Sequence, residues 1–338
     1  MSEQLTRAPL SILDFAMIFD HERPGTSFQR SVALAQEAEK LGYQRIWYAE
    51  HHNMSSISSA SPAVLIAHIG AQTNSIRLGA GGVMLPNHSP YVVAEQFGTL
   101  AELYPDRIDL GLGRAPGTDQ LTLGRALRRL PDAAQTFPDD VVELQKYLAD
   151  ESIIDGVRAV PGAGTHIPLY ILGSSLFGAE LAARLGLPYS FASHFAPDLL
   201  EQAVSLYRAQ FQPQRSGDKP YVIAAVNVLA APTSAQAHER FVQVQRAWVR
   251  NMASRGRYLN DVQLDQVMDS YAGRKILDMM RYTAVGTADE VRDYLEKFQR
   301  HAQADELMIS LRAPRWQDTM ESLRLLAQAW ELNSIDTL

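Results

Sequence analysis

Two stretches of the chain share one pattern, in which a helix passes through a glycine directly into a strand. Residues 38–48 read A-E-K-L-G-Y-Q-R-I-W-Y, and residues 182–192 read A-A-R-L-G-L-P-Y-S-F-A. The glycine is typical of the residue that ends a helix, because glycine adopts the left-handed backbone conformation there without strain. A strand that follows its helix so closely is typical of repeated strand–helix units, and such units predict a parallel sheet.

Short apolar runs elsewhere predict further strands of the same sheet. These runs are bounded by glycine, proline and polar residues, as strands are. The predicted strands lie at residues 10–19, 43–48, 76–79, 107–113, 169–172, 189–192, 221–229 and 306–311. Eight such units predict an α/β fold of the closed (β/α)8 TIM-barrel type, and a doubly wound open sheet is the alternative.

We expect a single barrel domain over residues 1–338, because no linker or low-complexity tract interrupts the pattern. Residues 115–136 and about 250–284 do not fit a minimal barrel, since both stretches are long and polar or mixed in character. We expect both to be insertions on the carboxyl-end face of the barrel, where lids over active sites occur.

The composition argues against several classes of function. The net charge is -7 and the pI is about 5.7, with Lys and Arg scattered along the chain, so we expect no nucleic-acid partner. The chain has no cysteine, which removes disulfides, thiolate nucleophiles and cysteine metal sites. No apolar run approaches the roughly 20 residues that cross a bilayer, and the N-terminus lacks the apolar core of a signal peptide. We therefore expect a soluble, cytoplasmic protein without a membrane partner.

The strand at residues 107–113 ends in an arginine, Arg114, at the edge where α/β proteins place their ligands. A guanidinium presents paired donors that match phosphate oxygens, so Arg114 is a candidate phosphate clamp. An arginine in a salt bridge at the barrel rim is the alternative. Gly111 and Gly113 resemble the start of a dinucleotide-binding motif, but Pro116 at its third glycine position argues against that motif.

Ser174 and Ser175 follow another predicted strand and open a helix. Backbone N–H groups at a helix N-terminus, together with two hydroxyls, can bind phosphate, and ordinary capping of the helix by one serine is the alternative. Because Arg114 is a candidate phosphate clamp as well, the phosphate site is favoured over ordinary capping of the helix.

Two adjacent histidines follow the strand at residues 43–48, within Glu50-His51-His52-Asn53. A histidine there can act as a base or an electrophilic stabiliser near neutral pH. Metal binding is disfavoured, because adjacent strand residues point in different directions and no spaced third ligand is evident. We expect no metal, and one histidine of the pair is interpreted as a hydrogen-bonded rim residue.

Two further strand ends carry candidate ligand-binding residues. Ser193 and His194 follow the strand at 189–192 and are predicted to wall the same pocket, with a hydrogen-bonded rim histidine as the alternative for His194. The run Gly79-Ala80-Gly81-Gly82 allows the backbone to approach a flat ligand closely, although a turn that needs positive φ is the reading that composition alone favours.

Taken together, these features resemble the luciferase-like flavin-dependent monooxygenase family over nearly the whole chain. The resemblance rests on Tyr48–Asn53, Gly79–Pro86, His88–Pro90, Glu95-Gln96, Arg107–Arg114, Gly173–Gly186 and Ala284–Thr287.

The resemblance implies a (β/α)8 barrel, usually dimeric, that binds FMN at the carboxyl ends of its strands. It implies that His51 is the active-site histidine and that Arg114, Ser174 and Ser175 surround the flavin phosphate. Gly81-Gly82 matches the place of a non-proline cis peptide beneath the flavin ring, and Glu50, Ser193 and His194 are expected beside the cofactor.

The implied activity is that of a monooxygenase in which reduced FMN and O2 form a C4a-peroxyflavin that oxidises a small organic substrate. We expect a homodimer supplied with reduced FMN by a separate NAD(P)H:flavin reductase. The alternatives are F420-dependent hydride transfer and flavin binding without turnover. Bacterial luciferase has a reactive cysteine where this chain has Gly113, so its thiol-dependent behaviour does not carry over. The resemblance does not imply light emission either, because luciferase is a heterodimer with a particular lid and aldehyde pocket.

Overall fold

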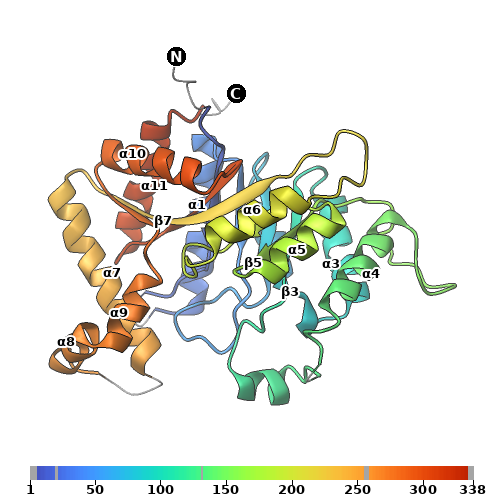
Figure 1. Cartoon of the computed structure of the whole chain (residues 1–338), viewed down its shortest axis with the longest axis horizontal. Coiled ribbons are helices and arrows are strands. Elements are labelled where there is room, and N and C mark those ends of the chain that lie inside the picture. The colour runs from blue at the N-terminus through green and yellow to red at the C-terminus, as the bar shows by residue number, and fades with distance from the viewer. Residues whose placement is uncertain (1–5, 20–21, 131, 255–258, 334–338) are drawn as a thin grey trace.

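Nine parallel strands form the centre of the structure, a computed structural model that describes residues 6–19, 22–130, 132–254 and 259–333 (Figure 1). The strands are β1 (Leu10–Asp14), β2 (Arg45–Tyr48), β3 (Arg77–Met84), β4 (Ile108–Gly113), β5 (Leu169–Gly173), β6 (Tyr189–Phe191), β7 (Val222–Ala230), β8 (Thr283–Gly286) and β9 (Glu306–Leu311). They pair in the order β6-β5-β4-β3-β2-β1-β9-β7-β8, and a further pairing of β6 with β7 closes eight of them into a barrel. The predicted (β/α)8 barrel is confirmed, and the open-sheet alternative is wrong.

Helices cover the outside of the barrel and connect successive strands (Figure 1). They are α1 (Pro24–Leu41), α2 (Pro62–Gly70), α3 (Pro90–Leu103), α4 (Phe137–Ala149), α5 (Leu176–Leu185), α6 (Leu200–Gln210), α7 (Ser234–Ser254), α8 (Asp261–Asp269), α9 (Tyr271–Asp278), α10 (Ala288–His301) and α11 (Trp316–Trp330). A short π-helix, η2 (Thr122–Ala126), lies in the segment between β4 and α4. That segment and the pair α8–α9 lie on the side of the molecule away from the N and C marks of Figure 1.

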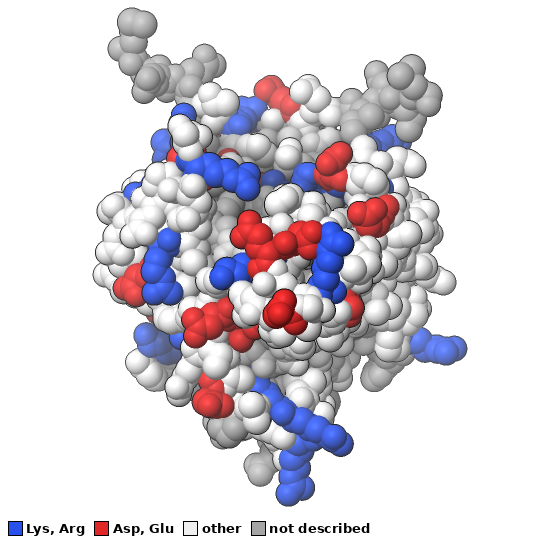
Figure 2. Space-filling view, turned by 90° about the vertical axis from the view of Figure 1, so that its right-hand side faces the viewer, with Lys and Arg blue, Asp and Glu red and all other residues white. Residues whose placement is uncertain are grey.

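The surface carries charges of both signs. On the face shown in Figure 2, Lys and Arg side chains are interspersed with Asp and Glu side chains, and neither sign forms an extended field. Within the ranges given above, none of the helices combines the length and the apolar character that a bilayer crossing requires.

Both helix–glycine–strand joints adopt the expected geometry. Gly42 ends α1 with φ of 85°, and Gly186 ends α5 with φ of 62°. Both values lie in the left-handed region, where a side chain would be strained. The repeated pattern therefore marks true helix ends, and each strand begins within three residues of its glycine.

The strand β8 is absent from the predicted set and lies outside the barrel wall. It pairs with the carboxyl-terminal half of β7, from Asn227 opposite Thr283 to Ala230 opposite Gly286. The amino-terminal half of β7 pairs with β6, which ends at Phe191. A strand of four residues with alternating partial burial gives too short an apolar run to be separated from the loop before it.

The first strand is shorter than the predicted run of residues 10–19. It ends at Asp14, whose Oδ1 accepts a hydrogen bond of 2.8 Å from the backbone N–H of Ala16. Ala16 has a φ of 47°, so the backbone turns here and cannot continue as a strand. Phe15 is thereby released from the strand at the barrel mouth.

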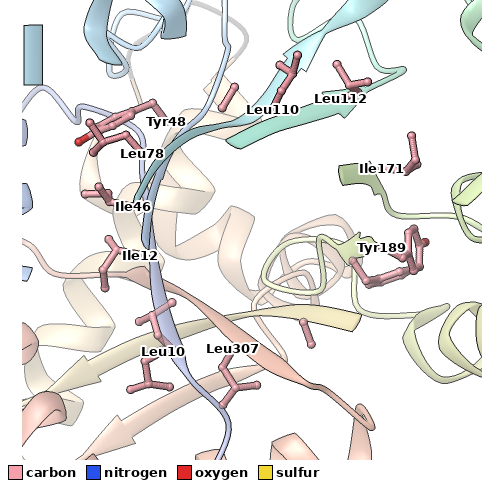
Figure 3. Packing of buried hydrophobic residues seen from close by; sticks show 14 of the residues in the cluster. Leu10, Ile12, Ile46, Tyr48, Leu78, Leu110, Leu112, Ile171, Tyr189 and Leu307 are labelled. Carbon is pink, nitrogen blue, oxygen red and sulfur yellow. The ribbon is translucent and has the colours of Figure 1, made fainter. Parts of the chain in front are cut away.

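The strand side chains that face the helices form a continuous apolar layer (Figure 3). Its fully buried members include Leu10, Ile12, Ile46, Tyr48, Leu78, Leu110, Leu112, Ile171, Tyr189 and Leu307. Each large apolar side chain of this kind contributes about 1.5–3 kcal/mol when it leaves water. The layer between strands and helices is therefore the main core, and it leaves the barrel interior available for polar groups.

A charged network fills the interior at the amino-terminal ends of the strands. Arg45 donates from Nη1 to Asp109 at 2.7 Å, and its Nε lies 2.9 Å from Oε1 of Glu306. Tyr170 accepts a second hydrogen bond from Arg45, and Tyr221 donates to Glu306. Burial lowers the pKa of the Arg45 guanidinium, but the two carboxylates outweigh burial and raise it. This end of the interior is charged, buried and internally paired.

Candidate active site

His51, the candidate catalytic residue, lies just beyond the carboxyl end of β2. Its ring stacks on Phe15, with centroids 6.0 Å apart and an interplanar angle of 21°. Nδ1 of His51 is buried and has no hydrogen-bond partner among the described residues. Burial lowers the pKa of His51, and a hydrogen bond with the backbone of Gly117 offsets this only in part. His51 is therefore a neutral imidazole at pH 7 with one unpaired ring nitrogen.

Glu50 is enclosed rather than open to the barrel mouth. Its Oε1 accepts hydrogen bonds of 2.8 Å from Nε2 of His52 and of His88, and its Oε2 accepts one of 3.0 Å from the backbone of Met84. Burial raises the pKa of Glu50, but these hydrogen bonds and the charge of His88 outweigh it and lower the pKa to about 2. The side chain is 1% exposed. Both carboxylate oxygens of Glu50 thus join the loops after β2 and β3, and the cofactor contact expected of Glu50 stays a prediction.

Ser193 and His194 follow β6 and have different surroundings. Ser193 is fully buried, and its hydroxyl donates to the carbonyl of Ala225 at 2.5 Å. The donor of Ser193 is used inside the barrel wall, and the cofactor contact expected of Ser193 stays a prediction. His194 reaches the mouth, where its ring centroid lies 6.1 Å from that of Phe15.

The imidazole of His194 is neutral, like that of His51. Its Nδ1 is buried and unpaired within the described part of the chain, so it is not the satisfied rim histidine that was the alternative. Burial, with smaller repulsion from Arg312 and His51, lowers the pKa of His194 to about 3. Two neutral imidazoles therefore flank Phe15.

The Gly81-Gly82 peptide bond is cis, as the resemblance implied. It lies where β3 shifts its register against β4, between Ala80 and Val83. A Cβ on Gly82 would come within 2.8 Å of the carbonyl oxygen of Gly111 in β4. The glycines serve close approach of two backbones, and the alternative of a positive-φ turn is wrong, because neither residue has a positive φ.

Arg114 extends from the end of β4 to the start of α5. Its Cζ lies 3.9 Å from the ring centroid of Phe177, in the first turn of that helix. It is exposed, and among the described residues it forms no salt bridge, so the rim ion pair considered as an alternative is not formed. The cation is therefore held at a helix N-terminus with its donors unpaired.

The N-terminus of α5 is open in the same way. Ser175 is the N-cap residue, but its side chain makes no capping hydrogen bond, so the capping alternative is wrong for this residue. Ser174 and Ser175 are both partly exposed. Two hydroxyls and the first backbone N–H groups of a helix, beside an unpaired arginine, make this a candidate anion site, and its role in phosphate binding stays a prediction.

Three residues that sequence reasoning missed complete the mouth. Arg312 follows β9, and its guanidinium lies over the rings of Phe15 and Trp248, with Cζ at 5.1 and 5.2 Å from their centroids. Its Nε donates to Oδ1 of Asn227 at 3.1 Å. The amide of Asn227 also donates to the carbonyl of His194 at 2.6 Å, at the point along β7 where β6 ends.

The order of the strands sets these groups on opposite sides of the mouth. Arg114 and the α5 N-terminus belong to β4 and β5, whereas Phe15 and Arg312 belong to β1 and β9. Two strands separate the pairs on either route around the barrel. The mouth therefore has an anion site on one side and a cluster of histidines, aromatic rings and one arginine on the other. Among the described residues, no group of three or more His, Asp and Glu side chains is placed to hold a metal ion.

Comparisons with known proteins agree with this architecture. The family model of the luciferase-like monooxygenases matches residues 10–304. A luciferase-like monooxygenase of Escherichia coli strain K12 is 45% identical over 302 residues, which cover 89% of this chain and 90% of that protein. N-acetyl-S-alkylcysteine monooxygenase of Bacillus subtilis strain 168 is 31% identical over 333 residues, which cover 95% and 97% of the two chains.

A solved structure shows the same arrangement. The crystal structure of apo-MsnO8 aligns with a TM-score of 0.86 at 36% sequence identity, and the alignment covers 97% of this chain and 100% of that one. The sequence match and the barrel together establish that the chain belongs to the luciferase-like monooxygenase family.

Proposed function

We propose that the chain is an FMN-dependent monooxygenase that uses reduced FMN and O2 to oxidise a small organic substrate. The observation that carries this proposal is the pairing of an open phosphate site, Arg114 with the α5 N-terminus, with an enclosed pair of neutral histidines across the same mouth. Family membership supports the monooxygenase class. The relative that is named for N-acetyl-S-alkylcysteines supports a small organic molecule as substrate.

The residues present fit the phosphate end of FMN. Arg114 provides a fork of N–H donors, and Ser174 and Ser175 provide hydroxyls beside the α5 backbone N–H groups. Phe177 fixes the guanidinium by a cation–π contact, which reduces the entropy lost when an anion binds. The bulge at Gly81-Gly82 presents backbone without side chains, as close contact with a flat ring requires.

His51 is the residue to which we assign proton transfer. When bound, reduced FMN supplies the activation of dioxygen. His51 holds a neutral ring whose Nδ1 is free to accept or return one proton beside that chemistry. Phe15 stacks on the ring of His51 and excludes water from one face of it.

The remaining parts of the proposal concern the assembly. We assign residues 1–338 to one barrel domain, with residues 115–136 and about 250–284 as lid segments over the mouth; residues 1–5, 20–21, 131, 255–258 and 334–338 of these ranges lie outside the described residues. Reduced FMN comes from a separate NAD(P)H:flavin reductase, because the chain has no dinucleotide-binding glycine motif. A homodimer in the cytoplasm completes the proposal.

Anaerobic titration with photoreduced FMN, followed by rapid mixing with oxygen, tests the function. Reduced FMN should bind, and oxygen should produce a transient flavin absorption band that differs from those of free oxidised and free reduced FMN. Reoxidation of bound FMN at the rate of free FMN would indicate flavin binding without turnover. Tighter binding of reduced F420 than of reduced FMN would favour the hydride-transfer alternative. Rapid NADPH consumption by the chain alone would remove the reductase from the proposal.

A further inference from the structure

Arg312 is a cation at the barrel mouth that no carboxylate of the described residues neutralises. Its one hydrogen bond to another side chain runs from Nε to a neutral amide, Asn227. Nη1 and Nη2 donate to no described residue. The side chain is partly accessible, so a ligand can reach these donors. Burial, with no compensating acid, lowers the pKa of Arg312 to about 10, so the group still carries its charge at pH 7.

The rings around Arg312 fix the plane of the guanidinium. Phe15 and Trp248 hold Cζ at 5.1 and 5.2 Å from their centroids, and Asn227 holds the Nε edge. The Nη1–Nη2 side of the fork is left for a ligand. A planar fork with paired N–H donors matches the two oxygens of a carboxylate better than a neutral acceptor.

A second unpaired donor lies beside the first. Nε1 of Trp248 is buried and has no hydrogen-bond partner within the described ranges. An indole N–H can only donate. The Nη groups of Arg312 and Nε1 of Trp248 therefore lack an acceptor among the described residues. A buried donor without a partner is destabilising until a ligand supplies an acceptor.

Arg312 lies across the barrel mouth from the candidate phosphate site and close to His51. It belongs to β9, opposite β4 and β5 in the barrel order, so Arg114 and Arg312 face different parts of the mouth. Phe15, which contacts Arg312, also contacts His51 and His194. A molecule held by Arg312 therefore has its remaining atoms beside His51.

We propose that Arg312 anchors a carboxylate of the organic substrate, so that this chain oxidises small organic acids and orients them by their charged end. The identification of the bound acid as a substrate rests on the proposed monooxygenase function. The carboxylate site itself does not depend on that function. Arg312 is a specificity residue, because it touches the substrate away from the reacting atoms. The reduced flavin ring is a second source of anionic oxygen, and the experiment separates the two.

The test compares charged and neutral ligands of equal shape, namely acetate with acetamide and benzoate with benzamide. Binding is measured by ligand-observed NMR at pH 7.5 and constant ionic strength, with the chain alone and with the chain saturated with oxidised FMN. We expect each carboxylate to bind about tenfold or more tightly than its amide, as hydrogen bonds to a charged group allow. Equal affinity of acids and amides in both states would overturn the proposal.

Variants assign the preference to this residue. R312M should abolish the preference for the carboxylate and leave amide binding within about twofold, and R312K should keep part of it, because the charge remains without the fork. R315M is the matched control, since Arg315 lies three residues further on, is exposed and pairs with Asp318. A carboxylate preference that survives in R312M would overturn the assignment.

Two further readouts keep the result interpretable. R312M should weaken binding of reduced FMN by less than about threefold, and a loss of tenfold or more with an intact carboxylate preference would assign the anion to the flavin instead. The thermal midpoint of R312M should equal or exceed that of the wild-type chain, because a half-buried charge without a carboxylate partner is replaced by an apolar side chain. If the chain binds no FMN, the proposed function fails while the carboxylate test still stands.

Discussion

The two ends of the barrel interior hold an arginine in opposite ways. At the amino-terminal end, Arg45 lies between Asp109 and Glu306, at 2.7 and 2.9 Å. At the carboxyl-terminal end, Arg312 lies between two aromatic rings and donates to one neutral amide. Carboxylates of the protein neutralise Arg45, whereas no carboxylate of the described residues neutralises Arg312, which is open to a ligand.

The contrast between the paired Arg45 and the unpaired Arg312 assigns a stabilising role to one end of the barrel axis and a binding role to the other. A buried pair is useful to stability only while both partners are present, because each charge has lost its water. An unpaired cation lowers stability, and it persists where a ligand completes it. The amino-terminal end is therefore the structural end of this barrel, and the carboxyl-terminal end is the candidate binding end, called the binding end below, as is usual for the fold.

The largest expected effect is at the structural end. R45M leaves Glu306 and Asp109 buried with fewer donors, and we expect the free energy of unfolding to fall by about 3–5 kcal/mol. Urea denaturation at pH 7 measures it. R158M is the control, because Arg158 and Asp150 form an exposed pair whose loss should change stability by about 1 kcal/mol or less. A change below 1 kcal/mol in R45M would remove the distinction between the two ends.

The next effect concerns Glu50, a buried carboxylate near the binding end. The pKa of Glu50 is lowered from 4.5 to about 2, so its ionised form stabilises the folded state above the unfolded pKa. That contribution, about 3 kcal/mol, is lost as the pH falls from about 5 towards 2. We expect the stability advantage of the wild-type chain over E50Q to be full at pH 6 and clearly smaller at pH 3. An advantage that does not change with pH would show that the charge of Glu50 is not its source.

Much of the fold could be predicted from sequence because its signals are local. A glycine after a helical apolar pattern fixes a helix end, and short apolar runs fix the barrel strands. The strand β8 and the true end of β1 could not be found this way. The first depends on pairing with half of β7, and the second depends on a turn at Ala16 that the carboxylate of Asp14 stabilises.

Candidate site residues could be proposed from sequence where they lie close to the end of a strand, as Arg114 does directly after β4 and His51 does three residues after β2. Arg312 had the same signal, since it follows the last strand directly, and it was missed because no second motif accompanied it. Trp248 had none, because a residue near the end of α7 reaches the mouth only through the packing of that helix. Hydrogen bonding also separates residues that sequence treats alike, because the side-chain oxygens of Glu50 and Ser193 are engaged, whereas Nδ1 of His194 has no partner among the described residues.

His51 sharpens the comparison within the binding end, because its neighbour His52 is already engaged by Glu50. H51N should retain reduced-FMN affinity and slow the oxygen-dependent step by about a hundredfold, within the usual range for a proton-transfer residue. H52N is the matched control and should slow that step far less. Stopped-flow absorbance per bound flavin measures both. If H51N instead loses flavin and reacts normally once loaded, His51 is a cofactor ligand and not the proton-transfer residue.

The smallest expected effect tests the second unpaired arginine of the binding end. R114M should weaken FMN binding by about 1.5–3 kcal/mol, because a hydrogen bond to a charged phosphate is lost at the α5 N-terminus. Riboflavin lacks the phosphate, so its affinity should be the same for R114M and the wild-type chain. Fluorescence titration with both flavins measures the difference, and R184M at the far, exposed end of α5 serves as the control. Equal losses for FMN and riboflavin would mean that Arg114 supports the flavin ring or the local fold, and the phosphate would then have to be placed elsewhere around the mouth.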